Sequence, residues 1–209
     1  MKTGLFFDLD GTLWDSAEGV VLSWNEALEG LGRPERVTVK QMYTLMGKTM
    51  AEIAHLVIPT EPQAEADRLL KVCTDAENAY LAEHGGRLYE GVEETLRELR
   101  ERSLFLAVVS NCQSGYIEAF MKAHRLERAF DDFECYGNTG RGKADNIRLT
   151  AERNGLDRTY YLGDTRGDYD SAMQAGVSFI HAAYGFGTVP EGTPAIHSFR
   201  ELSALPDLR

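Results

Sequence analysis

The chain has few cysteines and no long apolar run. The three cysteines, Cys73, Cys112 and Cys135, are odd in number and show no CxxC pair and no zinc-ligand spacing. This pattern indicates reduced thiols in a cytoplasm and argues against a disulfide framework. No stretch approaches the ~20 apolar residues that span a bilayer, and the apolar run before Asp8 is too short for a signal peptide. We therefore expect a soluble, cytoplasmic protein with no membrane partner.

Basic residues are also scarce. The chain has 22 lysines and arginines against 33 aspartates and glutamates, which gives a net charge of -11. Non-specific binding of nucleic acid depends on lysine and arginine, because these residues neutralise phosphates and release counterions. We therefore expect no nucleic-acid partner. An acidic chain that handles an anionic substrate must instead concentrate positive charge locally, through a metal ion or a few basic side chains.

Short apolar runs alternate with helical patterns over most of the chain. Its 209 residues are 43% hydrophobic, which is enough to bury a core. The alternation predicts an α/β fold: a Rossmann-like, open parallel sheet with ligands at the carboxyl ends of its strands. The predicted strands are Leu5–Leu9, Leu104–Ser110, Tyr160–Gly163 and Val177–Ala182, and the predicted helices are Gly91–Arg102, Ser114–His124, Lys143–Asn154 and Asp168–Ala175.

One segment breaks this alternation, because residues 16–86 show helical periodicity and no convincing strand. A single crossover helix usually suffices after a first strand, so an insertion of this length predicts a separate helical cap domain. We expect a core domain of residues 1–15 and 87–209 and a cap of residues 16–86, which opens and closes about the two linkers. The predicted cap helices are Ala17–Leu31, Val39–Leu45, Thr49–Val57 and Pro62–His84.

Two aspartates stand one residue apart where the first strand ends. Asp8 and Asp10 would share a face of an extended chain, and Gly11 permits a sharp exit from it. Carboxylates so close together repel, so the arrangement makes chemical sense mainly with a cation or a proton beside them. Solvated acids in a strand-end turn are the ordinary alternative for an isolated pair of this kind.

A second acidic pair, Asp164 and Asp168, follows another apolar strand and opens a helix. Both side chains offer hard oxygen ligands, and Mg²⁺ typically takes one or two protein carboxylates. Helix capping is the alternative, since aspartate is favoured at helix starts. Capping accounts for one of these aspartates but not for the occurrence of both acidic pairs at strand ends.

Two further segments suit an anion. Ser110 and Asn111 end a strand, where a hydroxyl and a backbone N–H can hold a phosphate oxygen, although both residue types commonly cap helices. Lys143 begins a helix, so that its charge and the positive helix end reinforce each other around an anion. A solvated surface lysine is the ordinary alternative. Lys122 is a rival for the phosphate lysine, but it stands near the end of a predicted helix, away from the strand ends.

Taken in order, these four segments resemble the motifs of the haloacid dehalogenase superfamily. The insertion between the first and second motifs is similar to the helical-cap class, which includes phosphoglycolate phosphatases and β-phosphoglucomutases. The third motif departs from a common pattern in that class, because Ala144 rather than proline follows the lysine. The residues that match the motifs are Asp8, Asp10 and Thr12 in the first, Ser110 in the second, Lys143 in the third, and Asp164 and Asp168 in the fourth.

The resemblance implies a Mg²⁺-dependent phosphatase. Asp8 would attack phosphorus to form an aspartyl-phosphate, and Asp10 would act as general acid and then general base. Magnesium would neutralise the repulsion between the nucleophile and the anionic ester. The implied metal ligands are the carboxylate of Asp8, the main-chain carbonyl of Asp10, and Asp164 with Asp168, and the implied phosphate-binding residues are Thr12, Ser110, Asn111 and Lys143.

The expected substrate is a small phosphorylated metabolite, and the protein is expected to be a monomer or a weak homodimer. Lys48 in the cap could meet a substrate carboxylate or a second phosphate, although a plain helix-start lysine is as good an interpretation. A β-phosphoglucomutase-like transferase remains an alternative, but Val20, Val21 and Trp24 stand where that resemblance favours a histidine. A dehalogenase would not need the predicted metal. A non-catalytic phosphate-binding module is the other alternative.

Overall fold

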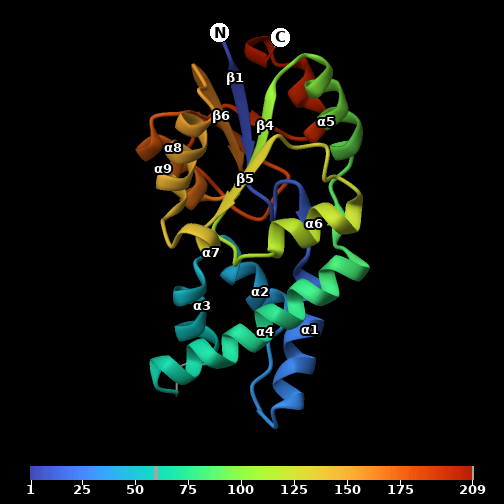
Figure 1. The fold of residues 1–209 in the computed structure, drawn as a ribbon, viewed down its shortest axis with the longest axis vertical. Helices are drawn as coiled ribbons and strands as arrows, with labels where there is room; N and C mark the ends of the chain where they lie inside the picture. Colours follow the sequence, from blue (N-terminus) through green and yellow to red (C-terminus); the bar gives the residue numbers. More distant parts are fainter. Residues whose placement is uncertain (59–60, 209) are drawn as a thin grey trace.

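Six parallel strands form one sheet in the computed structural model, which describes residues 1–58 and 61–208. Helices cover both faces of the sheet, and four further helices lie together beyond its carboxyl ends (Figure 1). This confirms the predicted α/β class. In spatial order the strands are β5 (Asp132–Cys135), β4 (Phe105–Ser110), β1 (Thr3–Phe7), β6 (Arg158–Gly163), β7 (Ser178–Ala182) and β8 (Ala195–Ile196).

The central strand β1 shows how the two faces are filled. Successive side chains of a strand point to opposite faces, and both faces of a parallel sheet are normally covered. Leu5 and Phe7 pack into the larger hydrophobic cluster, whereas Phe6 packs into a second cluster on the other face. The larger cluster includes residues of α5 (Val92–Glu101) and α6 (Tyr116–His124), and the second includes residues of α8 (Lys143–Arg153) and α9 (Arg166–Ala175).

Every predicted strand and helix is present, with ends within two residues of the predicted bounds. The two edge strands of the sheet, β5 and β8, were not predicted from the sequence. The four residues of β5 include Asp132 and Glu134, and a segment so short and acidic does not stand out as a strand. Arg153 neutralises it, with ion pairs of 2.7 Å to Asp132 and 2.6 Å to Glu134. The β8 strand has only two residues. Short helical turns also went unpredicted: α7 (Tyr136–Thr139), η1 (Phe199–Ala204) and η2 (Pro206–Leu208).

A small antiparallel pair joins the sheet to the helices beyond it. The strands β2 (Trp14–Asp15) and β3 (Arg87–Leu88) bring together the two chain segments that lead into and out of residues 16–86. Asp15 forms an ion pair of 3.3 Å with Arg87 across this pair. Both linkers are therefore held side by side at one narrow neck.

The helices beyond the neck contribute to the larger hydrophobic cluster. The longest, α4, packs along α1 and against α6, so it contacts both its own group and the sheet-covering layer (Figure 1). Among the described residues, no helix has the length and apolar character required to cross a membrane. The helices of this group are α1 (Ala17–Gly30), α2 (Val39–Leu45), α3 (Met50–Val57) and α4 (Gln63–His84).

Candidate active site

The motif residues predicted from sequence lie at one edge of the sheet. Asp8 follows β1, Ser110 ends β4 and Asp164 follows β6, while Lys143 begins α8 and Asp168 stands in the first turn of α9. Because these strands are parallel, their carboxyl ends meet at the same edge. All five side chains are buried. The chain therefore concentrates three carboxylates, a hydroxyl and an ammonium in a place largely closed to water.

Lys143 lies between two of the carboxylates. Its Nζ is 2.9 Å from Oδ1 of Asp8 and 2.5 Å from Oδ1 of Asp168. Burial on its own would lower the pKa of Lys143, but the charges of Asp168 and Asp8 outweigh that effect and raise the pKa above its usual range. Lys143 therefore stays charged, and the surface-lysine alternative is wrong.

Asp168 has a capping role as well. Its Oδ2 accepts hydrogen bonds from the backbone N–H of Thr165 (2.9 Å) and from the hydroxyl of Thr165 (2.6 Å). The Thr165 hydroxyl in turn accepts from the backbone N–H of Asp168, which completes a capping box at the start of α9. One carboxylate thus fixes the helix start with one oxygen and pairs with Lys143 through the other.

Asp164 is held by a loop that follows β7. Its Oδ2 accepts hydrogen bonds from the backbone N–H groups of Phe186 (2.7 Å) and Gly187 (3.2 Å). Its Oδ1 is buried and has no hydrogen-bond partner among the described residues. Gly11 packs directly against this carboxylate: its φ is +80°, and a Cβ there would lie 2.3 Å from Oδ2 of Asp164. The turn after β1 and the acid after β6 therefore fit together only with glycine at position 11.

The charge balance of this cluster favours a cation. Carboxylate oxygens of Asp8, Asp164 and Asp168 all lie within 4.8 Å of one another, against the single ammonium of Lys143. Burial, and then the charge of Asp168, raise the pKa of Asp8 to about 6; burial and the charges of Asp168 and Asp8 raise that of Asp164 to about 8. A divalent cation would offset this repulsion. Oδ1 of Asp164, which no described residue binds, offers it a hard oxygen ligand. These residues fit a magnesium ion.

Asp10 is not among the three carboxylates of this cluster. Its Oδ1 accepts hydrogen bonds from the hydroxyls of Ser16 (2.7 Å) and Tyr116 (2.9 Å), which are themselves 2.7 Å apart. Removal from water raises the pKa of Asp10 to about 7; the charge of Asp8 adds to this rise, while the bonds from Ser16 and Tyr116 oppose it. A carboxyl with a pKa near neutrality can both give and take a proton at physiological pH.

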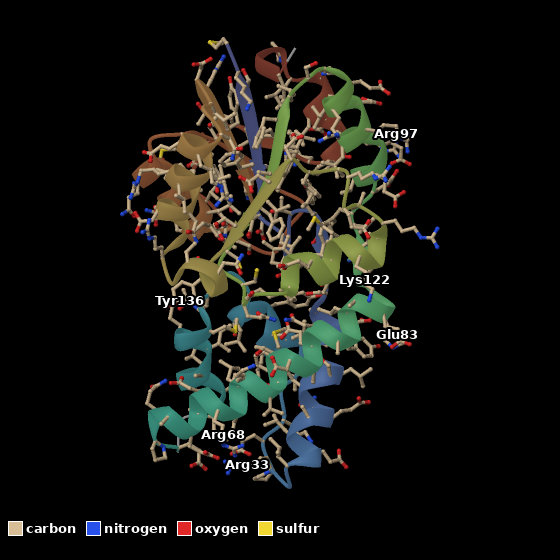
Figure 2. The ribbon with its side chains drawn as sticks, viewed as in Figure 1. Arg33, Arg68, Glu83, Arg97, Lys122 and Tyr136 are labelled. Carbon is tan, nitrogen blue, oxygen red and sulfur yellow. The ribbon has the colours of Figure 1, made fainter. Side chains whose placement is uncertain are left out.

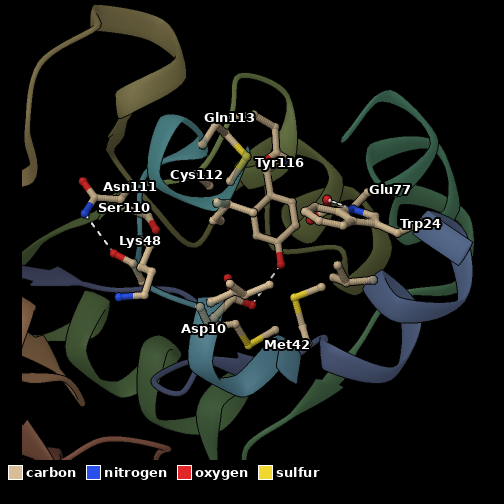
Figure 3. Close-up of a pocket in the computed structure, with 16 residues that line it drawn as sticks. Asp10, Trp24, Met42, Lys48, Glu77, Ser110, Asn111, Cys112, Gln113 and Tyr116 are labelled. Atoms are coloured by element: carbon tan, nitrogen blue, oxygen red, sulfur yellow. Dashed lines mark hydrogen bonds between the residues drawn. The ribbon is translucent and has the colours of Figure 1, made fainter. Parts of the chain in front are cut away.

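The predicted phosphate-binding residues differ in their surroundings. Ser110 and Asn111 line a pocket beside Asp10, and the Asn111 side chain donates a 3.0 Å hydrogen bond to the carbonyl of Gly47 (Figure 3). Lys48 lines the same pocket. Thr12 is fully buried and does not belong to the lining of that pocket. A role for Thr12 at the phosphate therefore stays a prediction.

The rival lysine, Lys122, is exposed near the end of α6, as the sequence predicted (Figure 2). Four residues of this site were not predicted from the sequence. Ser16 and Tyr116 donate hydrogen bonds to Asp10, the backbone of Phe186 donates to Asp164, and Glu77 lines the pocket. A Gly-Phe-Gly run at residues 185–187 was the one local signal for a loop that approaches another backbone closely. Tyr116 had no such signal, because 106 positions separate it from Asp10.

Known proteins that resemble this chain include hydrolases and phosphatases. The family model described as haloacid dehalogenase-like hydrolase matches residues 5–182. Two relatives named phosphoglycolate phosphatase are similar along most of their length. The one from Escherichia coli (strain K12) is 28% identical, over 88% of this chain and 82% of its own. The one from Aliivibrio fischeri is 26% identical, over 86% of this chain and 83% of its own.

Solved structures share the fold. A haloacid dehalogenase-like hydrolase from Bacteroides fragilis superposes with a TM-score of 0.82 at 23% identity, and the match covers 97% of this chain and 100% of that one. CbbY from Rhodobacter sphaeroides, in complex with xylulose-(1,5)bisphosphate, superposes with a TM-score of 0.80 at 22% identity, over 97% of this chain and 96% of that one. Both matches therefore include the helices between β2 and β3 as well as the sheet.

Proposed function

Because this chain belongs to the haloacid dehalogenase-like hydrolase family and is a phosphatase, we propose that it hydrolyses a small phosphorylated metabolite through an aspartyl-phosphate on Asp8. The observation that carries this proposal is the buried cluster in which Lys143 lies between Asp8 and Asp168, with Asp164 alongside. Burying three acids around one lysine costs stability, and groups buried at such a cost cluster at functional sites.

Asp8 is the proposed nucleophile. One of its oxygens attacks phosphorus, the bond from phosphorus to the alcohol oxygen breaks, and the phosphoryl group stays on Asp8. Lys143, whose Nζ is 2.9 Å from Oδ1 of Asp8, is proposed to neutralise the added charge. Ser110, at the end of the neighbouring strand, is the proposed donor to a phosphoryl oxygen.

Asp10 is the proposed acid and base. It gives its proton to the departing alkoxide, and in the second step it takes a proton from the water that attacks phosphorus. The bond from phosphorus to the Asp8 oxygen then breaks, which releases phosphate and restores the Asp8 carboxylate. The two hydroxyls that bind Oδ1 fix the direction in which the carboxyl points. Its pKa of about 7 suits both steps.

Magnesium is the proposed cofactor. Asp8, Asp164 and Asp168 would hold it, with the main-chain carbonyl of Asp10 as a further ligand implied by the family resemblance. When bound, the ion would supply charge neutralisation at the phosphoryl group. We also propose that residues 16–86 form the cap, that residues 1–15 and 87–209 form the core, and that the β2–β3 neck is the hinge between them.

The test is phosphate release from a panel of small phosphate esters by the purified protein, with Mg²⁺ and with a chelator. Phosphoglycolate belongs on this panel because the curated relatives are named for it. We expect turnover of one or a few esters with Mg²⁺ and none with the chelator. The mutase alternative would be favoured by two results together: no ester releases phosphate, and phosphate is transferred only when a sugar bisphosphate is added.

Variants test the nucleophile. Asp8→Asn should lower kcat by at least about a thousandfold, because an amide is a poor nucleophile. Asp170→Asn is the matched control, since Asp170 is an exposed aspartate of α9 that pairs with Arg166 across one helical turn. Intact-mass detection of a phosphoenzyme in wild type but not in Asp8→Asn would support the intermediate. Activity retained in Asp8→Asn would refute the assignment.

A further inference from the structure

The pocket beside Asp10 is nearly filled by side chains. Its free volume is about 40 Å³, room for only a few water molecules, each of which needs about 10–15 Å³. Most of its wall is apolar, and methionine side chains are flexible enough to move aside for a small ligand. The apolar lining residues are Val20, Trp24, Met42, Leu45, Met46, Met50 and Ile53.

One acid stands within this apolar wall. Glu77 of α4 is only 4% exposed, and its Oε2 accepts a 2.6 Å hydrogen bond from the indole N–H of Trp24 (Figure 3). Of the described residues that line the pocket, Lys48 alone is basic. Burial raises the pKa of Glu77 to about 8, although the hydrogen bond from Trp24 opposes the rise. Gln113 also donates a hydrogen bond to Glu77. A carboxyl buried among apolar side chains still costs stability, and a substrate group that binds it would offset part of that cost.

The pocket is polar at two opposite ends. In Figure 3, Glu77 and Trp24 lie on one side, Ser110 and Lys48 lie on the other, and the Tyr116 ring lies between them. Ser110 stands at the sheet edge with Asp8, so the phosphoryl group belongs at that end. The alcohol part of the ester would then extend past Tyr116 toward Glu77.

We propose that Glu77 selects the substrate: a short phosphomonoester whose alcohol part has an apolar stem and ends in a hydrogen-bond donor, an amine or a hydroxyl. This inference rests on the proposed phosphatase function. An ammonium end would favour loss of the Glu77 proton and pair with the carboxylate that results, and a hydroxyl end would donate to the carboxyl. A carboxylate end could bind only to protonated Glu77, and it would leave its own charge without a cation at the apolar end of the pocket (Figure 3). Phosphoglycolate is therefore a poor fit to this end of the pocket.

The experiment uses esters of nearly equal size: 2-aminoethyl phosphate, 2-hydroxyethyl phosphate, propyl phosphate and phosphoglycolate. For the wild-type protein with Mg²⁺, kcat/KM should be at least about tenfold higher for the amine or hydroxyl ester than for propyl phosphate, because a site built for a polar group rejects its apolar analogue. Phosphoglycolate should be the poorest of the four. Comparison of kcat/KM for the amine ester and the hydroxyl ester shows whether Glu77 prefers a cation or a neutral hydrogen-bond donor.

Glu77→Gln cannot ionise but keeps an acceptor for the Trp24 indole. It should lower kcat/KM for the aminoethyl ester about tenfold, change the hydroxyethyl ester less, and leave propyl phosphate unchanged. The matched control is Glu83→Gln, an exposed glutamate on the same helix (Figure 2). It should leave all four values unchanged.

Two outcomes would overturn the inference. The first is a set of substrate ratios that is the same in Glu77→Gln and wild type. The second is a preference for phosphoglycolate that Lys48→Met abolishes and Glu77→Gln preserves. In that case Lys48 would bind a substrate carboxylate, and Glu77 would not select the substrate. If no ester, including p-nitrophenyl phosphate, is hydrolysed, the proposed function fails. Calorimetric titration of Asp8→Asn and Asp8→Asn/Glu77→Gln with 2-aminoethyl phosphate then decides the inference: weaker binding to the double variant supports it, and equal binding refutes it.

Discussion

Glu77 should weaken the folded protein as the pH rises, and Glu77→Gln should remove that effect. The pKa of this carboxyl is about 8 in the fold, against 4.5 for an ordinary glutamate. Between these values the native chain binds a proton that the unfolded chain has released. The free energy of unfolding therefore falls with rising pH, by at most about 1.4 kcal/mol per pH unit from this one group.

The magnitude follows from the pH interval. Between pH 5.5 and 7.5, both inside the window, Glu77 removes up to about 3 kcal/mol of stability. Glu77→Gln keeps the shape and a hydrogen-bond acceptor. The difference in free energy of unfolding between this variant and wild type should therefore grow in favour of the variant by about that amount across the interval. Asp8, Asp10 and Asp164 also have raised pKa values, and they push the wild-type curve in the same direction. The difference between variant and wild type cancels their contribution.

The assay is urea denaturation followed by circular dichroism at pH 5.5, 6.5 and 7.5, in the absence of Mg²⁺. Glu83→Gln on the same helix is the control, and its curves should stay parallel to wild type, since that side chain is exposed. A constant difference between Glu77→Gln and wild type at the three pH values would refute the reasoning. It would mean that the carboxyl is not kept from water.

Three further perturbations follow from the site and the sheet. Tyr116→Phe removes a donor that stabilises ionised Asp10, so the pKa of Asp10 should rise and the limb of the kcat profile that it controls should move up by about one pH unit or less. Gly11→Ala places a Cβ against Asp164, at a φ that disfavours alanine, so the Mg²⁺ concentration for half-maximal activity should rise at least about tenfold in a metal titration. Arg153→Met leaves the two acids of β5 unpaired at a partly exposed edge, so urea denaturation should show a loss of about 1 kcal/mol with kcat unchanged; equal stability would mean that the pairs contribute nothing.

Local patterns identified the central strands and the residues on them. Asp8, Ser110 and Asp164 each follow or end a short apolar run, and a buried parallel strand needs such a run regardless of its neighbours. The helix that begins at Lys143 was equally clear. The edge strand β5 was not, because it is short and acidic and is stabilised by Arg153, which lies in a different element.

The contacts between distant elements could not be predicted from single segments of the sequence. The sequence by itself determined which residues stand at the ends of strands, since strand and helix periodicity depends on the side chains of one segment. Only the tertiary structure decided that Tyr116 binds Asp10, that the backbone of Phe186 binds Asp164, and that Glu77 lies buried in the pocket. Each of these contacts joins elements far apart in the chain. Their geometry arises from packing, and no pattern within a single segment encodes the partner.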